Sequence, residues 1–587
     1  MRNSSEDKIT FIHFGILFLK KTSFELNFSY FCATLENQNP IFLIIQPICN
    51  RIFIASRALM CNKNPLNGYH NYHIIVMEKR KDVRQLIIEA AEKFGNTPAF
   101  IEGDKIYDFS TLKEEVFRLA NSLIDMGFKK GDKIAIYLPN CIEYVYAYLG
   151  IYSLGCMAVP IDFFLTGNEL ISIGNHCKLK GIITTTNIKF NLLKLKENIP
   201  TLREVITIED NPKYISFWKL TQNSRNHLED QGIKTNMPSS IFYTSGSSGM
   251  PKGAVWNYEH IHLGAEQLKC FCSYEGLQNI LKIDETERTI SAIPLSHSGG
   301  ILFVMVAIKY GMSTVIMPRF SPLNLIRLID KWGVTGIWMV PPMFYAVLYL
   351  KDVSKYKLES LRWADVFGAP SSPDLLMRFA KLFPNAVVIN GWGMTEVVPP
   401  ISASSPGNIQ SVGKPVPHNV ELKIFDAHDD EVATGKVGEI VAKGKSVFCG
   451  YYNEPDLNNE VFKNGWFYTG DLGRFDEQGN LYIIGKSKDT IKVGGELVWA
   501  AEIEEVLLKH PCVKEAAAIG IPDKLRGEVV KCFIVLKEGI VLPTRYIMEY
   551  LRDNLAKFKL PRQIEYLDEL PKTGTGKINK AALTEKN

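Results

Sequence analysis

Short apolar segments alternate with amphipathic helical stretches from residue 83 onward, and this alternation constrains the fold more than any other feature of the sequence. Apolar residues recur at helical spacing over Val83–Phe94 and over Leu112–Met126, which stops at Gly127, and Cys141–Leu154 is a strongly apolar helical stretch. The segments typical of buried strands are Lys133–Leu138, Met157–Ile161, Gly181–Thr185, Thr289–Pro294, Thr314–Met317 and Gly336–Val340. Strands that alternate with helices of this length predict an α/β fold with a largely parallel sheet covered by helices.

The composition narrows the class of protein. The chain has 587 residues, of which 46% are hydrophobic and 22% charged, and this excludes a disordered chain or a polytopic membrane protein. A net charge of +4 is too small to indicate nucleic acid as a partner, or more than peripheral membrane association. The 11 cysteines show no framework spacing, so we interpret them as reduced thiols of a cytoplasmic protein.

The first 76 residues differ from the rest of the chain. Residues 1–76 show no sustained helical or strand period, and their longest charge-free run, 37–50, contains two prolines and is too short to span a bilayer. We interpret this extension as lying outside the fold, with Met77 as the true start. An import or anchoring segment is the alternative. The remainder is predicted to form a large body, 77–487, and a small α+β domain, 488–587.

A loop rich in glycine and hydroxyl groups follows an apolar strand at Ile241–Gly253. Its residues are Thr244, Ser245, Gly246, Ser247, Ser248, Gly249, Met250, Pro251 and Lys252. Glycines let backbone N–H groups approach an anion, hydroxyls donate further hydrogen bonds, and Lys252 supplies charge, so we interpret the loop as a phosphate cradle. The Walker pattern is excluded because Pro251 precedes the lysine, and residues 254–256 favour a strand over a helix. A generic surface loop is the alternative on these residues alone.

Six more motifs follow in order: Pro294–Gly300, Phe367–Pro370, Asn390–Glu396, Tyr468–Asp471, Gly485–Lys492 and Pro571–Lys577. With this series, the chain from Met77 to Lys586 resembles the adenylate-forming superfamily, which includes acyl-CoA synthetases, luciferases and peptide-synthetase adenylation domains. The resemblance implies a body that includes a β-barrel-like subdomain and a C-terminal domain that is mobile.

The resemblance also implies a site for ATP and Mg²⁺. Glu396, with Thr244 from the loop, is expected to hold Mg²⁺, which prefers oxygen ligands. Trp392 resembles the aromatic residue that stacks on adenine, and Asp471 resembles the residue that accepts both ribose hydroxyls. A surface acid, a core tryptophan and a turn aspartate are the ordinary alternatives. The other residues expected at the nucleotide are Ser245, Gly246, Ser247, Ser248, Gly249, Lys252, Gly368, Ala369, Pro370, Gly391, Gly393, Met394 and Thr395.

Residues near the C-terminus are expected to act during the reaction. Lys577 resembles the lysine that bridges the acyl carboxylate and the α-phosphate, so Lys577→Ala should abolish adenylation but spare thiolysis of supplied acyl-adenylate. Lys486 stands where the family usually has an arginine at the ribose, and because lysine lacks the planar fork we expect weaker ATP binding. Lys488 aligns with the family's hinge, and Gly494-Gly495 resembles the turn that reaches the pantetheine tunnel of coenzyme A. A plain linker is the alternative.

The acid substrate is restricted only in part. Amino-acid-activating relatives carry an aspartate soon after the motif that contains His297, whereas residues 298–306 here are uncharged, and an unpaired ammonium there would be costly. His297 is expected at the carboxylate end of the acyl pocket. The apolar stretches 301–308 and 338–348 suit either an aliphatic or aryl pocket or a core. We predict a medium- or long-chain fatty acid.

The predicted function is therefore ATP-dependent formation of an acyl-adenylate, followed by transfer to CoA with release of AMP. Another acid–CoA ligase, a ligase that loads a carrier-protein pantetheine, a luciferase-like oxygenase and a catalytically idle acyl- or nucleotide-binding regulator remain alternatives. The oligomeric state is not indicated. His260 with His262, and Cys270 with Cys272, lack a second half at zinc spacing, so we interpret them as structural.

Overall fold

The computed structural model describes residues 82–244, 251–274, 277–278, 280–368, 371, 373–416, 419–493, 496–523, 526–572 and 578–584. All of them belong to Lys79–Asn587, one of the two units into which the chain divides. The predicted extension, 1–76, lies outside the described residues. The proposed boundaries at 76/77 and 487/488 stay predictions.

A nine-stranded sheet forms one half of the body. Its order is β16 (Lys414–Pro415), β15 (Val397–Ala403), β14 (Val387–Met394), β13 (Trp363–Val366), β12 (Gly336–Met339), β10 (Arg288–Ser291), β11 (Ser313–Ile316), β1 (Pro98–Glu102) and β2 (Lys105–Asp108). The pairs from β14 through to β1 are parallel, as predicted, whereas the strands at both edges are antiparallel.

A seven-stranded sheet forms the other half. Its order is β7 (Ile215–Ser216), β6 (Glu204–Thr207), β5 (Gly181–Thr184), β3 (Lys133–Tyr137), β4 (Met157–Pro160), β8 (Pro238–Thr244) and β9 (Lys252–Asn257). Only the last pair, β8 and β9, is antiparallel, and these two strands flank the predicted phosphate loop.

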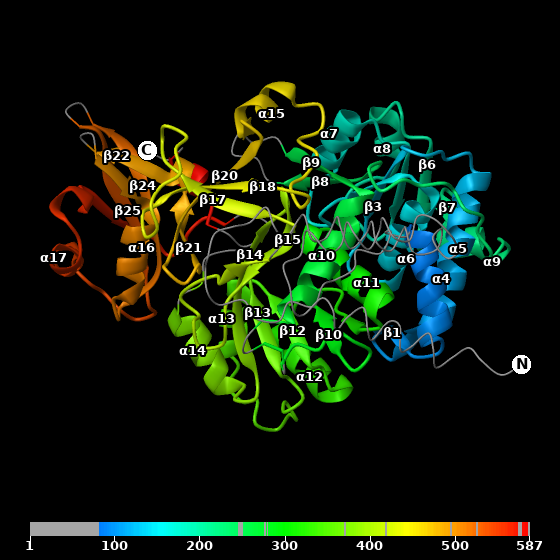
Figure 1. The fold of residues 1–587 in the computed structure, drawn as a ribbon, viewed down its shortest axis with the longest axis horizontal. Coiled ribbons are helices and arrows are strands. Elements are labelled where there is room, and N and C mark those ends of the chain that lie inside the picture. Colours follow the sequence, from blue (N-terminus) through cyan, green and yellow to red (C-terminus); the bar gives the residue numbers. More distant parts are fainter. Residues whose placement is uncertain are drawn as a thin grey trace, which may run out of the picture. The chain divides into compact units, whose positions relative to one another are not determined.

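Helices form three layers around the two large sheets. The largest core cluster joins the facing sides of the sheets through α4 (Val83–Phe94), α5 (Phe109–Asp125), α6 (Ile142–Leu154), α10 (Tyr258–Phe271) and α11 (Ser298–Tyr310) (Figure 1). The outer face of the nine-stranded sheet packs on α12 (Pro322–Trp332), α13 (Pro341–Leu348) and α14 (Pro373–Leu382). The outer face of the other sheet packs on α7 (Gly167–Cys177) and α8 (Leu193–Asn198), and α9 (Phe217–Gln222) contacts α5.

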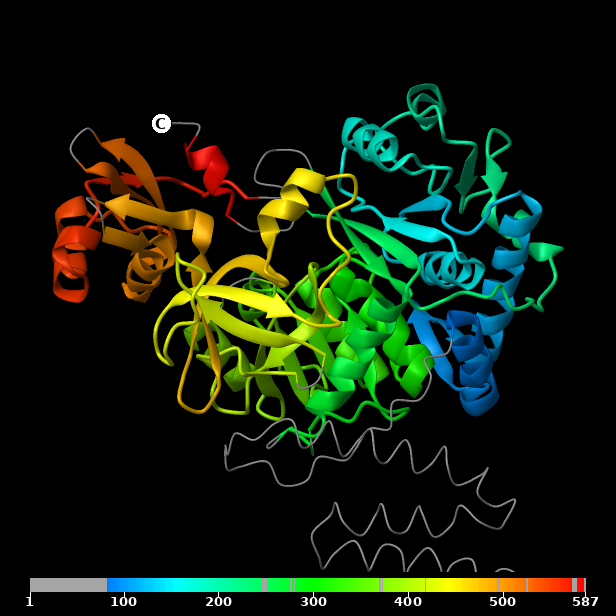
Figure 2. The same ribbon diagram turned by 45° about the horizontal axis from the view of Figure 1, so that its top comes forward.

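A third sheet and the C-terminal domain complete the described chain. The third sheet is five-stranded and antiparallel and contains β17 (Glu421–Phe425), β18 (Gly438–Lys443), β20 (Trp466–Phe475), β19 (Phe462–Lys463) and β21 (Leu481–Lys486). Helix α15 (Pro455–Val461) precedes β19. The 3₁₀ turn η1 (Ser487–Asp489) leads into a sheet of β23 (Glu496–Trp499), β22 (Thr490–Val493), β25 (Gly527–Leu536), β24 (Val513–Asp523) and β26 (Gln563–Tyr566). Helices α16 (Ala500–Lys509) and α17 (Thr544–Asn554) pack on one face of this sheet, α18 (Lys580–Thr584) packs on the other, and η2 (Lys557–Lys559) precedes β26 (Figure 2).

The element predictions are largely confirmed. Helix α4 has the predicted bounds, and each predicted strand is present to within about three residues at its ends. Helix α5 begins three residues earlier than predicted because Asp108 caps it, accepting a hydrogen bond of 2.7 Å from the Thr111 N–H. Within the described ranges, no helix combines the length and the apolarity that a bilayer crossing needs.

Candidate active site

The predicted phosphate loop connects two antiparallel strands. Thr244, the last residue of β8, lies directly opposite Lys252, the first residue of β9. No room exists for a side chain at Gly253, because an added Cβ would lie 2.7 Å from Ile241. Because residues 252–257 form strand β9, the strand predicted after the loop is confirmed. Ser245, Gly246, Ser247, Ser248 and Gly249 lie outside the described residues.

Glu396 lies at the turn between antiparallel strands β14 and β15, in the motif Asn390–Glu396. Two glycines of this motif are closely packed: an added Cβ would lie 3.0 Å from Asp365 Oδ1 at Gly391 and 2.8 Å from Pro399 Cβ at Gly393, so a side chain at either position would displace a neighbour. Met394 is half-buried and ends β14. The motif thus forms a tight hairpin that carries its acid at the tip.

Thr395 connects three motifs that are far apart in the sequence. Its carbonyl oxygen accepts a hydrogen bond of 2.8 Å from the Trp256 indole on β9, which follows the phosphate loop. Its hydroxyl lies 3.0 Å from the hydroxyl of Ser298, the residue after His297. The structure therefore brings together three parts of the site. These are the β8–β9 hairpin that carries the predicted phosphate loop (the phosphate hairpin), the His297 motif, and the β14–β15 hairpin with Glu396 at its tip (the Glu396 hairpin).

Glu396 is a buried carboxylate whose direct side-chain partner is a neutral group. Only 8% of the residue is exposed, and its Oε1 accepts a hydrogen bond of 2.8 Å from the Tyr451 hydroxyl. Burial raises the pKa of Glu396, and the bond from Tyr451 and the charge of Lys486 act in the opposite direction. In the described part of the chain no cation forms an ion pair with it. A buried carboxyl group without an ion pair among the described residues fits a site for a hard divalent cation.

Asp471 has a different environment. Its Oδ2 accepts a hydrogen bond of 3.1 Å from the Trp392 indole, and its Oδ1 forms an ion pair with Lys486. Asp471 and Lys486 lie directly opposite each other on β20 and β21. Each carboxylate oxygen has a second lone pair, so the group retains capacity for two hydroxyl donors. Trp392 is buried, and its stacking on adenine stays a prediction.

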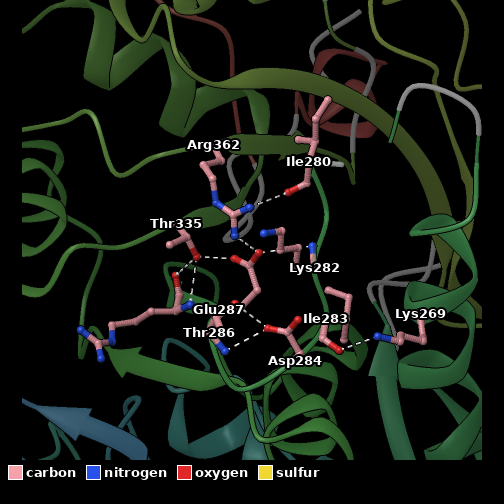
Figure 3. A network of polar contacts seen from close by, with 10 residues as sticks. Lys269, Ile280, Lys282, Ile283, Asp284, Thr286, Glu287, Thr335 and Arg362 are labelled. Atoms are coloured by element: carbon pink, nitrogen blue, oxygen red, sulfur yellow. Dashed lines mark hydrogen bonds and ion pairs between the residues drawn. The ribbon is translucent and has the colours of Figure 1, made fainter. Parts of the chain in front are cut away.

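Gly368 follows strand β13 with a φ of 82°, a conformation that favours glycine. The other end of β13 is held by Arg362, whose guanidinium bonds the Ile280 carbonyl at 3.2 Å and pairs with the buried carboxylate of Glu287 (Figure 3). Thr335, just before β12, donates to the other oxygen of Glu287. This network fixes the strand that leads to Gly368. Ala369 and Pro370 lie outside the described residues.

His297 caps the N-terminus of α11 at the surface of the body. Its side chain is 41% exposed, and its Nε2 lies 3.9 Å from Asp162 Oδ2. The apolar residues 301–308 of α11 are all buried in the main core, and Trp338 packs on Phe303 at a ring distance of 4.8 Å. The buried residues of α13 pack on the outer face of the nine-stranded sheet. The buried residues of both stretches therefore pack in the cores, whereas Pro342 and Tyr345 of α13 are exposed, and the acyl pocket stays a prediction.

Most of the residues expected to act around the C-terminal domain are not among those that the structure describes. Gly494, Gly495, Lys577 and the side chain of Lys488 lie outside the described residues. Among the described residues, Lys580 bonds Glu504 at 2.7 Å and lies 3.3 Å from Asp489 of η1, so α18, α16 and the end of the predicted hinge are joined.

The two pairs interpreted as structural hold no metal-binding arrangement. His260 and Asn257 form a reciprocal cap at the start of α10, each side chain bonding the other's backbone N–H at 3.0 Å. Cys272 donates to the Leu268 carbonyl at 4.0 Å. Groups of three or more His, Cys, Asp or Glu side chains able to hold a metal do not occur among the described residues.

Sequence reasoning missed two residues in this region. Tyr451, the hydrogen-bond donor to Glu396, belongs to the segment Gly450-Tyr451-Tyr452, which matches no chemical pattern by itself. Asp365 on β13 is buried, and its Oδ1 makes no hydrogen bond within the described residues. Burial raises its pKa to about 8, although a hydrogen bond from Trp338 opposes the shift. The only available signal for Asp365 is an acid inside an otherwise apolar strand.

Comparisons with known proteins agree with this geometry. Residues 87–452 match the family model described as AMP-binding enzyme, and residues 502–577 match the AMP-binding enzyme C-terminal domain. The chain is 30% identical over 544 residues to a long-chain-fatty-acid–CoA ligase of Salmonella typhimurium, covering 86% of this chain and 95% of the relative. It is 28% identical to a 4-coumarate–CoA ligase of Vanilla planifolia, and the alignment covers 86% of this chain and 93% of the relative.

Solved structures show the same similarity. The anthranilate CoA ligase AuaEII in complex with anthranoyl-AMP aligns with a TM-score of 0.78 at 27% identity, covering 87% of this chain and 98% of the other. A second similar structure is the o-succinylbenzoate CoA synthetase of Bacillus subtilis in complex with its acyl-adenylate intermediate. It aligns with a TM-score of 0.73 at 28% identity, and the alignment covers 84% of this chain and 96% of the other.

Proposed function

Since this chain belongs to the family of AMP-binding enzymes and is an AMP-forming ligase of an acid and a thiol, we propose that it converts a medium- or long-chain fatty acid to its CoA thioester. In the first step a carboxylate oxygen attacks the α-phosphorus of ATP, the bond to pyrophosphate breaks, and acyl-adenylate forms. In the second step the CoA sulfur attacks the acyl carbon and AMP leaves. A side-chain nucleophile is not needed because the adenylate is itself the activated acyl group.

The observation that carries the proposal is the arrangement around Thr395. The hydrogen bonds of Thr395 join the phosphate hairpin to the motif of His297, and the next residue, Glu396, is a buried carboxylate without an ion pair among the described residues. Attack of one anion on another requires that charge be neutralised and that the reacting oxygens be held in line.

We assign the roles of the site residues on this basis. Glu396 and Thr244 hold Mg²⁺, which supplies positive charge at the phosphate oxygens when it is bound. The loop 245–249 and Lys252 bind the phosphates, and Asp471 binds the ribose, with Lys486 as its neighbour. Lys577 acts in adenylation, His297 at the acyl carboxylate, and Lys488 with Gly494-Gly495 in the change to thioester formation. All of these roles are part of the proposal.

A fatty acid is favoured by two observations. The relative from Salmonella typhimurium is named a long-chain-fatty-acid–CoA ligase. Residues 298–306, at the start of α11, carry no charge that pairs a substrate ammonium. An aryl acid is the second candidate, because a similar relative is named 4-coumarate–CoA ligase and a similar solved structure holds anthranoyl-AMP.

The test is one substrate panel read by AMP release. Purified protein is given ATP, Mg²⁺, CoA and one acid at a time, from acetate to palmitate and including benzoate, coumarate and anthranilate, with reactions lacking CoA as controls. Turnover that rises with aliphatic chain length supports the proposal, and a preference for the aromatic acids replaces it with the second candidate. Holo-carrier protein in place of CoA tests the alternative acceptor. Absence of pyrophosphate exchange with every acid would indicate a regulator that binds without catalysis.

A further inference from the structure

A short segment, residues 446–452, connects the two sides of the phosphate site, and we call it the strap. On one side it bonds the strand that begins after Glu396: the Val398 N–H donates to the Ser446 carbonyl at 2.8 Å, and the Phe448 N–H donates to the Glu396 carbonyl at 3.0 Å. The strap therefore holds the backbone on both sides of Val397.

On the other side the strap bonds β9, the strand that leaves the phosphate loop. The Val255 N–H donates to the Gly450 carbonyl at 3.0 Å, and the Tyr452 N–H donates to the Gly253 carbonyl at 2.8 Å. Tyr451 lies between these two bonds. A residue in this position is fixed relative to both the Glu396 hairpin and the phosphate hairpin.

The backbone and side chain of Tyr451 are held from several directions. Its N–H donates to Asn458 Oδ1 at 2.7 Å, and its carbonyl accepts from Asn458 Nδ2 at 2.9 Å. Its ring packs edge-on against Phe448 at 4.9 Å, and the Lys252 ammonium lies 5.7 Å from the ring centroid on the phosphate-loop side. The hydroxyl has one proton to donate, and it donates that proton to Glu396 Oε1 at 2.8 Å.

The bond to Oε1 fixes the rotation of the Glu396 carboxylate and directs its second oxygen. Because the donor is a neutral hydroxyl and not an ammonium or guanidinium group, it orients the carboxylate without adding a counter-charge. We propose that Tyr451 is a positioning residue that presents the second carboxylate oxygen of Glu396 to the Mg²⁺ of Mg·ATP. This inference rests on the proposed function, in which Glu396 holds that ion.

The test uses Tyr451→Phe, which removes only the hydroxyl, in the full chain. Tyr452→Phe is the matched control, because the Tyr452 ring packs edge-on against His176 at 5.7 Å, whereas the hydroxyl bonded to the Glu396 carboxylate is that of the neighbouring Tyr451. The affinity of Mn²⁺ for the complex with a non-hydrolysable α,β-methylene ATP analogue is measured by electron paramagnetic resonance. The affinity of the analogue alone is measured by calorimetry in EDTA.

We expect Tyr451→Phe to weaken Mn²⁺ binding about tenfold, to leave metal-free analogue binding unchanged, and to regain its adenylation rate at raised Mg²⁺. Tyr452→Phe should behave as the wild type in all three measurements. Wild-type Mn²⁺ affinity in Tyr451→Phe, or an equal loss of metal-free and metal-dependent binding, would overturn the proposal.

Glu396→Gln separates this inference from the proposed function. If Glu396→Gln retains wild-type Mn²⁺ affinity, the assignment of Glu396 as a metal ligand fails, and the role of Tyr451 fails with it. If Glu396→Gln loses Mn²⁺ binding while Tyr451→Phe does not, only the role of Tyr451 fails. In the double variant, Tyr451→Phe should add no further loss, because its effect acts through Glu396.

Discussion

Two buried carboxylates of the site, Glu396 and Asp471, differ in what holds them. Glu396 is held by the hydroxyl of Tyr451, a neutral donor, whereas Asp471 is held by the Trp392 indole and paired with the ammonium of Lys486. A carboxylate oriented without a counter-ion attracts a cation, whereas a carboxylate that already has one offers only lone pairs to neutral donors. The difference supports the proposal that Glu396 holds a metal ion and that Asp471 binds the hydroxyls of a ribose.

Removing the charge of Glu396 should have the largest effect. We expect Glu396→Gln to slow adenylation by about a thousandfold, because a neutral amide binds the ion much more weakly than a carboxylate does. Pyrophosphate exchange measures this step. Thioester formation from supplied acyl-adenylate should remain within a few-fold of the wild type, and an equal loss in both steps would contradict the assignment.

Asp471→Asn should have a smaller effect, confined to nucleotide binding. We expect the KM for ATP to rise by about ten- to a hundredfold, because an amide replaces one acceptor oxygen with a donor. Steady-state kinetics with ATP and with 2′,3′-dideoxy-ATP measure the ribose contribution. The wild type should discriminate strongly between the two nucleotides and the variant only weakly; unchanged discrimination would show that Asp471 does not contact the ribose.

Changing the cation beside Asp471 should have a modest effect. We expect Lys486→Arg to lower the KM for ATP by about two- to fivefold, because a planar guanidinium can bond the carboxylate and a ribose hydroxyl together. Lys486→Met should raise the KM by a similar factor, since it leaves Asp471 without its ion pair. If arginine weakens ATP binding, the lysine is itself the better fit to this site.

A third carboxyl, Asp365, extends the comparison and should affect stability instead of the reaction. Like Asp471 it is bonded by an indole, that of Trp338, but no ion pair to it forms within the described residues, and burial raises its pKa to about 8. Below about pH 4 the folded and unfolded states are both protonated. Between about pH 4 and about pH 8 only the unfolded state ionises, so this group lowers stability as the pH rises.

Asp365→Asn removes this pH dependence. The difference in thermal midpoint, variant minus wild type, should therefore increase by a few degrees between pH 4 and pH 8 and stay constant above pH 8. Differential scanning calorimetry across that range measures the difference. A difference that does not vary with pH would mean that Asp365 is ionised in the folded protein.

Local patterns were sufficient to predict many elements of the fold. The helical spacing in Val83–Phe94 predicts the bounds of α4, and Pro251 with the β-prone residues after it predicts the strand β9 in place of a helix. The start of α5 was missed because the cap at Asp108 lies in a stretch that also reads as strand. The antiparallel edges of the two large sheets were missed because strand direction is set by connections and not by apolar runs.

Contacts between distant residues were beyond the reach of the sequence. Tyr451 lies 55 positions after Glu396, Asp471 lies 79 positions after Trp392, and Arg362 lies 75 positions after Glu287. Each motif identifies a residue type and its chemistry, but it does not identify which partner the fold brings to it.

The sequence by itself determined the alternation of strands and helices, the order of the motifs and the family to which they belong, because these depend on neighbouring residues. The tertiary structure alone decided that a neutral hydroxyl orients Glu396, that a lysine pairs with Asp471, and that Asp365 is buried with no ion pair from the described residues. The physical reason is that the charge state and direction of a carboxylate depend on the burial and donors around it, and these come from segments that only folding brings together.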